Sequence, residues 1–577
     1  MSNYNKHPFV EVKGFHNHAK EGYEAIVTEL KPKFETKKDF ILVIDTYPGV
    51  DYDEVVKGLG ELSFNKVIYA DDMYINGNDI SNKIKDDLTN DRVFGRMTTK
   101  SLNELIDEDK RLDMLNIMKE KNGPILLIGV GASLITKGDC FIYADLARWE
   151  IQLRYRQGMS NWKIENSNDS KLTKYKRGFF FEWRIADRHK KRNFNEFDYL
   201  LDTNVKNSPK MVTGEAFREG LRQTAKQPYR GVPYFDAGVW GGQWMKEVCG
   251  LDSEMDNYAW SFDGVPEENS LYLKYGSIRV EVPSIDVVLY QPIQLLGTKV
   301  HARFGAEFPI RFDLLDTMSG QNLSLQVHPI TEYIQEKFGI NYTQDESYYI
   351  LDASEDANVY LGVKSEIDIE KMKEELIVAS NGEEPFQADK YINKFPAKKH
   401  DHFLIPAGTI HCSGANTMVL EISATPYIFT FKLWDWERVG LDGLPRPIHL
   451  EHGFNVIDWG RDTKWVSNQL VNQVEEIKST NSYTEERTGL HEREFIETRR
   501  YWIKDEVKIS TFDSVNVLNL VEGKEAVVES LDNSFEPFVV HYAETFIIPE
   551  SVKEYIIKPY GESQGKEIGV VRAYVRT

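Results

Sequence analysis

The hydrophobic segments of this chain change character between residues 205 and 231, and this change limits the folds open to it. Before it, continuous apolar runs such as 40–44 (FILVI) and 124–130 (PILLIGV) alternate with helical segments. That is the pattern of buried parallel strands in an α/β domain. After it, short strand-like runs follow one another between Gly, Pro and Asp, which favours an antiparallel sandwich or barrel.

A chain of 577 residues is too long for one hydrophobic core, so the sequence predicts a multidomain protein. We expect an N-terminal α/β domain over 1–205, a polar linker over 206–230, a mainly-β domain over 231–490 and a small β domain over 491–577. A charged helical insertion at 367–377 interrupts the strands of the mainly-β domain.

Composition narrows the environment and the partners. The formal net charge of −21 repels a phosphate backbone, so we expect no nucleic-acid partner. The three cysteines, Cys140, Cys249 and Cys412, are far apart and form no C-x-x-C pair, which fits a reducing cytoplasm. The N-terminus has no apolar signal-peptide core, and no run of about eighteen apolar residues predicts a membrane span.

Three short segments of the mainly-β domain carry side chains suited to a divalent metal. Gln326 and His328 are two residues apart on a predicted strand and so face the same side. Glu346 opens an aromatic strand, and a Pro-x-Gly turn leads into the strand that carries His411. Two His, one Glu and one Gln leave a coordination position open, as in a catalytic rather than a structural site. A single His in a β-rich protein is usually an ordinary polar residue, so the metal prediction depends on the combination.

At these residues the chain resembles the type I mannose-6-phosphate isomerases, zinc enzymes of the cupin (jelly-roll) fold. The likeness is carried by 323–329 (LSLQVHP), 345–351 (DESYYIL), 405–411 (IPAGTIH) and 431–459, with weaker matches at 239–245 (VWGGQWM) and 545–555 (TFIIPESVKEY). The resemblance implies one Zn²⁺ per chain, with Gln326, His328, Glu346 and His411 as its ligands.

The resemblance also implies an activity, the aldose–ketose exchange between mannose 6-phosphate and fructose 6-phosphate. Lys432 falls at the family's catalytic arginine, and Ser324 and Arg438 are the expected substrate-binding residues. The chain departs from the family at Lys432, which lacks the forked guanidinium, and at Gln344, where the family has lysine. Arg438 and the nearby Arg446 could supply the missing fork.

The first domain has a faint likeness to P-loop nucleoside kinases, in 40–50 (FILVIDTYPGV), 70–74 (ADDMY), 123–132 and 145–156. Where Gly-Lys-Ser would follow, the chain has Asp51-Tyr52-Asp53, and acidic groups there would repel phosphate. We therefore expect a degenerate, non-catalytic kinase-like domain. The basic aromatic segment 174–192 could bind an anion, but a charged face with buried aromatics is the simpler interpretation.

Two alternatives to the isomerase stay open at this point. The first is a cupin that keeps the metal but senses a sugar or sugar phosphate without turnover, which Lys432 and Gln344 favour. The second is an iron-dependent oxygenase of the same fold, which the neutral ligand Gln326 disfavours. The sequence leaves the general base and the oligomeric state undetermined.

Overall fold

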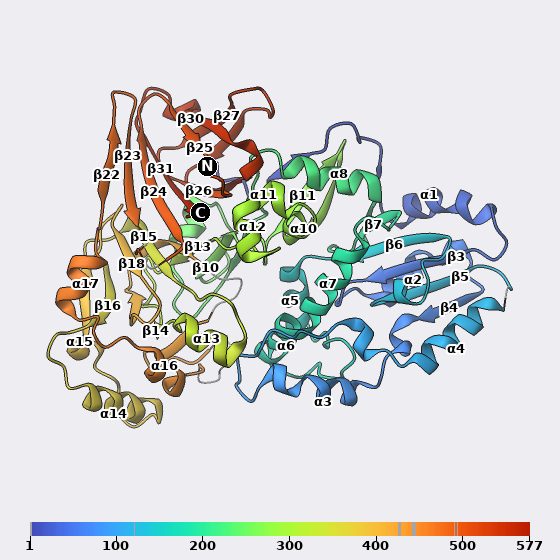
Figure 1. Ribbon diagram of the computed structural model, residues 1–577, viewed down its shortest axis with the longest axis horizontal. Helices are drawn as coiled ribbons and strands as arrows, with labels where there is room; N and C mark the ends of the chain where they lie inside the picture. Colours follow the sequence, from blue (N-terminus) through green and yellow to red (C-terminus); the bar gives the residue numbers. More distant parts are fainter. Residues whose placement is uncertain are drawn as a thin grey trace. The chain divides into compact units, whose positions relative to one another are not determined.

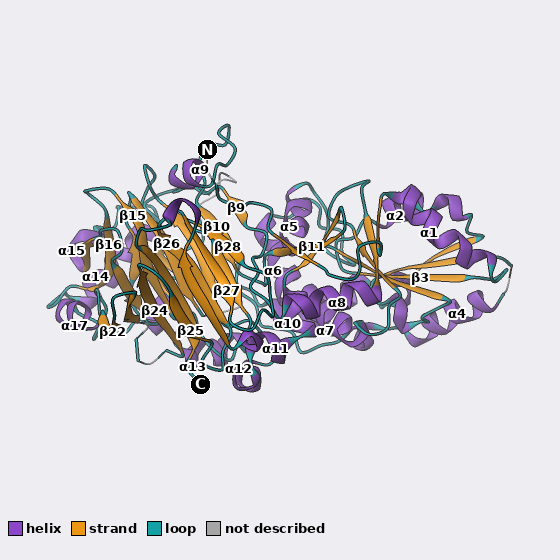
Figure 2. Cartoon of the chain, turned by 90° about the horizontal axis from the view of Figure 1, so that it is seen from above, coloured by secondary structure: helices purple, strands orange, loops and turns teal. Residues whose placement is uncertain are grey.

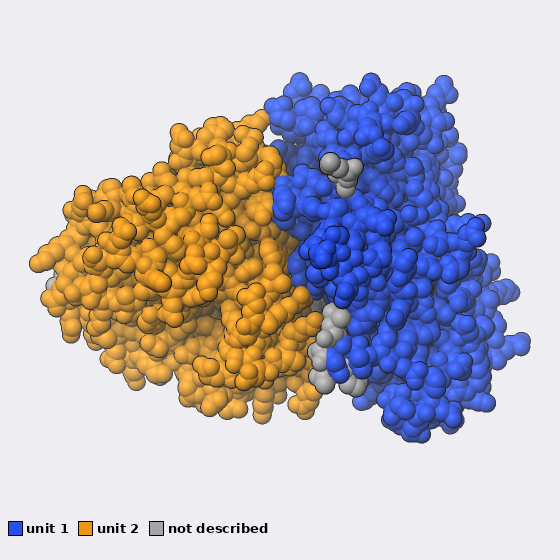
Figure 3. All heavy atoms as spheres, turned by 180° about the vertical axis from the view of Figure 1, so that it is seen from behind, with its two compact units in different colours: residues 1–8, 225–265, 292–577 blue, residues 9–224, 266–291 orange. Residues whose placement is uncertain are grey.

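The computed structural model describes residues 3–120, 122–424, 429–440, 443, 446–489, 491–492 and 494–577. The chain divides into two compact units (Figure 3). Unit 1 consists of residues 1–8, 225–265 and 292–577, and unit 2 of residues 9–224 and 266–291. Within the described residues, no helix has the length and apolar character needed to cross a membrane. Cys140, Cys249 and Cys412 are all buried and free.

Unit 2 is built around a seven-stranded sheet with the order β2-β8-β7-β6-β3-β5-β4. Strands β7, β6, β3, β5 and β4 pair in parallel, and β8 pairs antiparallel with both β7 and β2. The strands are β2 (Ala19–Glu21), β3 (Ile41–Thr46), β4 (Lys66–Tyr69), β5 (Ile125–Gly129), β6 (Cys140–Asp145), β7 (Tyr199–Asp202) and β8 (Lys210–Thr213). The two predicted apolar strands are thus β3 and β5, and their side chains are buried because helices cover both faces of the sheet.

Figure 2 shows α1 and α2 on one face of this sheet and α4 and α7 on the other. The α-helices of unit 2 are α1 (Tyr23–Glu35), α2 (Tyr52–Gly58), α3 (Gly77–Leu88), α4 (Glu108–Lys119), α5 (Arg148–Arg156), α6 (Lys171–Arg177), α7 (Trp183–Asn193), α8 (Gly214–Thr224) and α10 (Ile285–Tyr290). A π-helical turn, Gly178–Glu182, joins α6 to α7. Phe179, Phe180, Phe181 and Trp183 are fully buried there, so the basic segment 174–192 does bury its aromatic side chains.

The predicted boundaries of the first domain are wrong at its C-terminal end. Residues 206–230 are not a linker, because they contain β8 and α8, whose Phe217 and Leu221 are fully buried in unit 2. Unit 2 also includes residues 266–291, which the sequence analysis assigns to the mainly-β domain. That segment forms the hairpin of β11 (Ser270–Tyr275) and β12 (Ile278–Pro283), beside β1 (Phe9–Glu11). A local strand pattern does not say which sheet a strand joins.

Unit 1 contains two antiparallel sheets whose strands supply the predicted metal ligands (Figure 1). The first has the order β18-β15-β20-β13-β10-β9 and the second β17-β16-β19-β14-β21. The strands of the first are β9 (Tyr234–Asp236), β10 (Trp260–Gly264), β13 (Arg311–Asp316), β15 (Glu346–Ala353), β18 (His402–Ile405) and β20 (Thr417–Ser423). Those of the second are β14 (Leu325–Val327), β16 (Asn358–Val363), β17 (Ile392–Pro396), β19 (His411–Ser413) and β21 (Phe431–Trp434).

Two further sheets complete unit 1, with the orders β22-β23-β24-β31-β26-β29 and β25-β30-β27-β28. Their strands are β22 (Glu475–Ser479), β23 (Tyr483–Gly489), β24 (Ile496–Ile503), β25 (Val507–Ser510), β26 (Asn516–Glu522), β27 (Glu525–Ser530), β28 (Phe538–His541), β29 (Thr545–Ile548), β30 (Glu554–Pro559) and β31 (Ile568–Val575). The helices of unit 1 are α9 (Trp244–Val248), α11 (Pro292–Leu296), α12 (Thr298–Phe304), α13 (Thr331–Phe338), α14 (Ile369–Ser380), α15 (Ala388–Tyr391), α16 (Leu450–Val456) and α17 (Thr463–Gln469).

The predicted boundary at 490/491 falls inside one of these sheets. Strands β22 and β23 precede the boundary, yet they pair with β24 beyond it. Strand β22 reads EEIKS and is exposed along its length, so it lacks the alternation by which a half-buried strand is recognised. Residue 490 itself lies outside the described residues, as do 441, 442, 444 and 445 within the family-like stretch. The helical insertion predicted at 367–377 corresponds to α14.

Tyr4 and Asn5 anchor the N-terminal segment to unit 1. The Tyr4 hydroxyl donates to Asp263 at 2.8 Å, and the backbone N–H of Asn5 donates to Glu544 at 2.6 Å. Arg230 joins both carboxylates, at 3.2 Å from Asp263 and 2.7 Å from Glu544. All three charged groups are almost fully buried, so each depends on its partners, because an unpaired charge in the core is costly.

We expect Tyr4→Phe to destabilise unit 1, because it removes one donor from the buried carboxylate of Asp263 while leaving the ring in place. The expected cost is about 1–2 kcal/mol of unfolding free energy, measured by urea denaturation. Asn3→Ala, at an exposed neighbouring position, serves as the control and should change stability by less than about 0.5 kcal/mol. Equal stability of Tyr4→Phe and the unaltered protein would contradict this role.

Candidate metal centre

The structure brings the four predicted metal ligands together from the two facing sheets of unit 1. Gln326 lies on β14, where it is paired directly with His411 on β19, and His328 follows at the end of β14. Glu346 opens β15 in the other sheet. All four side chains are buried, with 7% of Gln326 and no more than 1% of each of the others exposed.

Glu346 lies between the two imidazoles. Its Oε2 is 3.0 Å from Nε2 of His328, and its Oε1 is 3.0 Å from Nε2 of His411. One donor atom from each of these three residues lies within 4.8 Å of the others. These separations are what two imidazoles and a carboxylate need in order to face a single divalent ion.

Backbone carbonyls orient both imidazoles. Nδ1 of His328 donates to the carbonyl of Phe429 at 2.8 Å, and Nδ1 of His411 donates to the carbonyl of Thr409 at 2.9 Å. A neutral imidazole with its proton on Nδ1 has its lone pair on Nε2. Both lone pairs therefore face Glu346, which is the arrangement that hydrogen bonds from the far ring nitrogen impose on metal-bound histidines.

The carboxylate of Glu346 dominates the electrostatics of the cluster. Burial by itself raises the pKa of Glu346, but the proximity of His328 and His411 holds it well below its ordinary value. Burial lowers the pKa of His411, whereas for His328 the attraction of Glu346 outweighs burial and the pKa rises. Within the described residues, neither Nε2 of His328 nor Oε1 of Glu346 makes a hydrogen bond. These buried acceptor atoms fit a bound cation.

Gln326 completes the ligand set from beside His411. Its amide nitrogen lies 3.2 Å from Nε2 of His411, so rotating the amide by 180° would bring its carbonyl oxygen to the same point. The turn before His411 depends on Gly408, which has a φ of 89°. A Cβ at that position would also lie 3.0 Å from the carbonyl oxygen of Val456, so glycine suits both the conformation and the space.

Lys432, the predicted catalytic residue, is next to Gln326 in the second sheet. The two residues are paired directly between β14 and β21, and directly opposed residues project from the same face. Lys432 is half-buried. The row His411–Gln326–Lys432 therefore runs across three strands on the side of the sheet that carries the metal ligands.

Ser324 and Arg438, the predicted substrate-binding residues, meet around a buried carboxylate instead. Ser324 donates to Asp435 at 2.8 Å and Arg438 at 2.5 Å, and Arg446 lies 2.8 Å from the same carboxylate. Arg438 also donates to the carbonyl of Asn322 at 2.6 Å. These bonds tie the ends of β14 and β21 together. Substrate binding by Ser324 and Arg438 stays a prediction.

Two polar residues beside Glu346 complete the site, and one of them was not predicted. Glu421 on β20 is paired with Tyr348, so it projects from the same face as Glu346. Burial, with the nearby carboxylates of Glu346 and Asp313, raises its pKa well above the usual value. Gln344 donates to Glu346 at 2.9 Å and accepts from the Phe429 N–H at 3.0 Å. In the sequence, Glu421 is the single acidic residue within the apolar run TMVLEIS, and an acid in such a run is the signal that could have indicated a functional residue.

In unit 2, acidic residues end the central parallel strands, where α/β folds commonly bind ligands. Asp45 at the end of β3 is held by His189 at 2.7 Å and by the N–H of Gly131 at 2.8 Å. Lys190 pairs with Asp145 and, at 2.5 Å, with Asp286. The kinase-like assignment stays a prediction. Asp51 caps α2 by accepting from the Glu54 N–H at 3.1 Å, so the N-terminus of this helix is occupied by a carboxylate of the chain itself.

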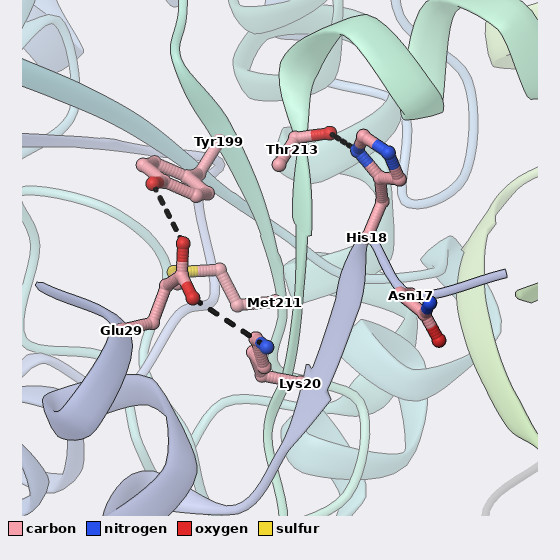
Figure 4. Close-up of a pocket in the computed structure, with 7 residues that line it drawn as sticks. All are labelled: Asn17, His18, Lys20, Glu29, Tyr199, Met211 and Thr213. Atoms are coloured by element: carbon pink, nitrogen blue, oxygen red, sulfur yellow. Dashed lines mark hydrogen bonds and ion pairs between the residues drawn. The ribbon is translucent and has the colours of Figure 1, made fainter. Parts of the chain in front are cut away.

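Unit 2 also has a small pocket of about 250 Å³ at its β2 edge (Figure 4). It is lined by Asn17, His18, Lys20, Glu29, Tyr199, Met211 and Thr213. Glu29 is 3.5 Å from Lys20 and accepts from Tyr199 at 3.3 Å, and His18 bonds Thr213 at 3.1 Å. Because these polar groups bond one another, we assign no ligand to this pocket.

Fold and site thus describe a multidomain protein whose β-rich unit holds a buried His/Glu/His cluster suited to a metal. Among curated proteins, the chain is 24% identical over 325 residues to mannose-6-phosphate isomerase of Streptococcus mutans, covering 55% of this chain and 90% of that protein. It is 26% identical over 233 residues to mannose-6-phosphate isomerase ManA of Bacillus subtilis, covering 39% and 66%. These relatives support a relationship to a family of sugar-phosphate isomerases.

The solved structures that resemble this chain include mannose 6-phosphate isomerase from Bacillus subtilis, at 18% identity and a TM-score of 0.48, covering 60% of this chain and all of that one. A putative mannosephosphate isomerase from Archaeoglobus fulgidus matches at 17% identity and a TM-score of 0.46, covering 61% and 98%. Residues 22–226 match a family described as a domain of unknown function, DUF8485.

We expect zinc to stabilise the protein through this cluster. At about one hundred times its dissociation constant, a ligand that binds only the folded state adds about 2.7 kcal/mol, so zinc should raise the melting temperature of metal-stripped protein. Glu346→Gln and His411→Ala should abolish the shift, whereas His16→Ala, at an exposed histidine, should retain it. Elemental analysis of protein purified without added metal gives the resident ion. Iron there would favour the oxygenase alternative, and no shift in any variant would contradict a metal site.

Proposed function

We propose that the chain is a zinc-dependent isomerase of the cupin class that interconverts mannose 6-phosphate and fructose 6-phosphate. The observation that carries the proposal is the set of donor atoms around Glu346, with both imidazole Nε2 atoms 3.0 Å from its carboxylate. The similarity to curated mannose-6-phosphate isomerases supports the same choice of substrate. A cytoplasmic location is part of the proposal, because hexose phosphates are intracellular metabolites.

In this proposal four residues bind the metal, and two cationic residues interact with the substrate. Gln326, His328, Glu346 and His411 would hold the ion, which when bound would polarise the sugar oxygens as a Lewis acid. Lys432, on the same face as Gln326, would place a positive charge near the oxygen on which negative charge develops. Arg446 is half-buried beside Asp435 and could contribute to holding the phosphate.

Glu421 is our candidate for the group that moves the proton between the two carbons. An aldose–ketose exchange needs a base that removes a proton beside the carbonyl and returns it to the adjacent carbon. Glu421 shares a sheet face with Glu346, and its raised pKa strengthens it as a proton acceptor once it is ionised. Of its side chain, 8% is exposed, whereas Glu346 is fully buried and faces the imidazoles.

The direct test is a coupled assay for fructose 6-phosphate formed from mannose 6-phosphate. We expect turnover that is lost on chelation and restored by zinc, and that is lost in His411→Ala because a ligand is missing. The control is His16→Ala, which should retain turnover. Absence of turnover in zinc-loaded, folded protein would rule out the isomerase.

Substituting Glu421 tests the proton-transfer role separately. Glu421→Gln keeps the shape of the side chain but cannot accept the proton, so kcat should fall by about 10²–10⁴-fold while zinc still stabilises the protein. Glu336→Gln, at an exposed glutamate in the same unit, is the matched control. An unchanged kcat in Glu421→Gln would assign the base to another residue.

A second candidate is a metal-containing sensor of a sugar or sugar phosphate that does not turn it over. Gln344 favours it, because the amide is uncharged and bonds both Glu346 and the Phe429 backbone. Lys432 favours it too, because an ammonium cannot form the two parallel hydrogen bonds of a guanidinium. Stabilisation by mannose 6-phosphate without formation of fructose 6-phosphate would select the sensor.

A further inference from the structure

The sheet face that carries Glu346 continues well beyond the metal cluster. Directly paired residues form one row, Tyr348–Glu421–Asp313–Phe262–Tyr234, across the strands β15, β20, β13, β10 and β9. Residues paired in this way project from the same side of a sheet. Glu346 is two residues from Tyr348 and Trp260 two from Phe262, so both share that side.

The two ends of the row differ in exposure. Tyr348 is fully buried, 8% of Glu421 and 4% of Asp313 are exposed, and Phe262, Tyr234 and Trp260 are only half-buried. The row therefore runs from the enclosed metal cluster to a partly exposed end, at which the Tyr234 hydroxyl and Trp260 Nε1 are themselves buried. Three strand spacings separate β15 from β10, which carries Trp260 and Phe262, roughly 14 Å at about 4.8 Å each. A hexose phosphate at the metal cluster is too short to span that distance.

The partly exposed end is aromatic. We call Tyr234, Trp260 and Phe262 the aromatic rim. The rings of Tyr234 and Phe262 are stacked, with centroids 6.4 Å apart and planes 15° apart, and those of Trp260 and Phe262 are 5.9 Å apart. The guanidinium of Arg311 lies 5.6 Å from the Phe262 centroid and its Nη2 lies 3.0 Å from Asp313 Oδ2. Flat rings beside an ion pair offer both stacking faces and hydrogen-bonding groups.

The charges beside the rim select a neutral ligand. Asp313 and Asp236 place carboxylates on this face, and the guanidinium of Arg311, two residues from Asp313 on the same strand, is paired with the Asp313 carboxylate. A second phosphate would be repelled here. A pyranose ring suits the rim, because its axial C–H groups form an apolar face that packs on aromatic rings while its hydroxyl groups reach the polar neighbours.

We propose that the aromatic rim is a second sugar subsite that binds a neutral glycosyl unit. The substrate class is then a hexose 6-phosphate that carries a further, uncharged sugar. The assignment of the first sugar to the metal cluster rests on the proposed isomerase function. The rim itself is argued from strand register, burial and ring geometry, and its occupation can be measured without turnover.

Calorimetric titration of the zinc-loaded full-length protein with β-1,4-mannobiose, mannose and adenosine tests the subsite. We expect mannobiose to bind at least about tenfold more tightly than mannose. Trp260→Leu and Phe262→Leu keep apolar volume but remove the flat rings, so each should weaken mannobiose binding by about tenfold or more. Tyr560→Ala, at a tyrosine of unit 1 that is 47% exposed and lies off the row, should leave that affinity unchanged.

The outcomes separate the two proposals. Equal affinities for mannobiose and mannose, or binding of adenosine in place of mannobiose, would overturn the subsite even if mannose 6-phosphate is isomerised. Mannobiose binding that both leucine variants weaken would support the subsite even if no isomerisation occurs, and only the isomerase would then fail. Mannobiose affinity that survives in folded Trp260→Leu and Phe262→Leu, confirmed by their melting temperatures, would place the sugar elsewhere and overturn the rim.

Discussion

Two imidazole lone pairs and a carboxylate facing one another inside an apolar core form a donor set suited to a cation, and much of unit 1 positions these three groups. The backbone carbonyls of Phe429 and Thr409 fix the orientation of the rings. The two sheets bring the donors together from opposite sides, because Glu346 belongs to one sheet and His411 to the other. A cation would therefore also hold the two sheets together at this point, so the chemistry of the site and the stability of the fold depend on the same few atoms.

Sequence patterns predicted the local features well and the assembly of the sheets less well. The apolar runs that became β3 and β5 and the donor set around Glu346 could be recognised, because burial and ligation leave characteristic residues at fixed spacing. The segment 206–230 was mistaken for a linker, since the short β8 and the amphipathic α8 follow a polar turn. The hairpin of β11 and β12 reads like any other strand pair, so its return to unit 2 depends on distant partners such as β1.

The sequence also does not show which side chains share a face of a sheet or which side chains are bound to a buried partner. Glu421 stands alone in an apolar strand, and only the register with Tyr348 shows that it shares a face with Glu346. Ser324 and Arg438, which the resemblance predicts to bind substrate, both bond the carboxylate of Asp435, a contact that the sequence does not reveal. In unit 2, Lys190 and Arg148 look like surface cations of helices in the sequence, but they are almost fully buried against carboxylates.

The path of the chain has a consequence for synthesis on the ribosome. Unit 2 is complete once residue 291 has emerged, whereas unit 1 holds the opening segment, 225–265 and everything from 292 onward. Domains generally fold as units in the order in which they emerge. The α/β unit can therefore finish folding while Glu544, the buried partner of the Asn5 N–H and of Arg230, has still to be translated. During that interval the nascent chain contains one folded unit inserted between two segments of an unfolded unit. A chain that terminated early would lack Glu544, and the Asn5 N–H and Arg230 would then be without that buried partner.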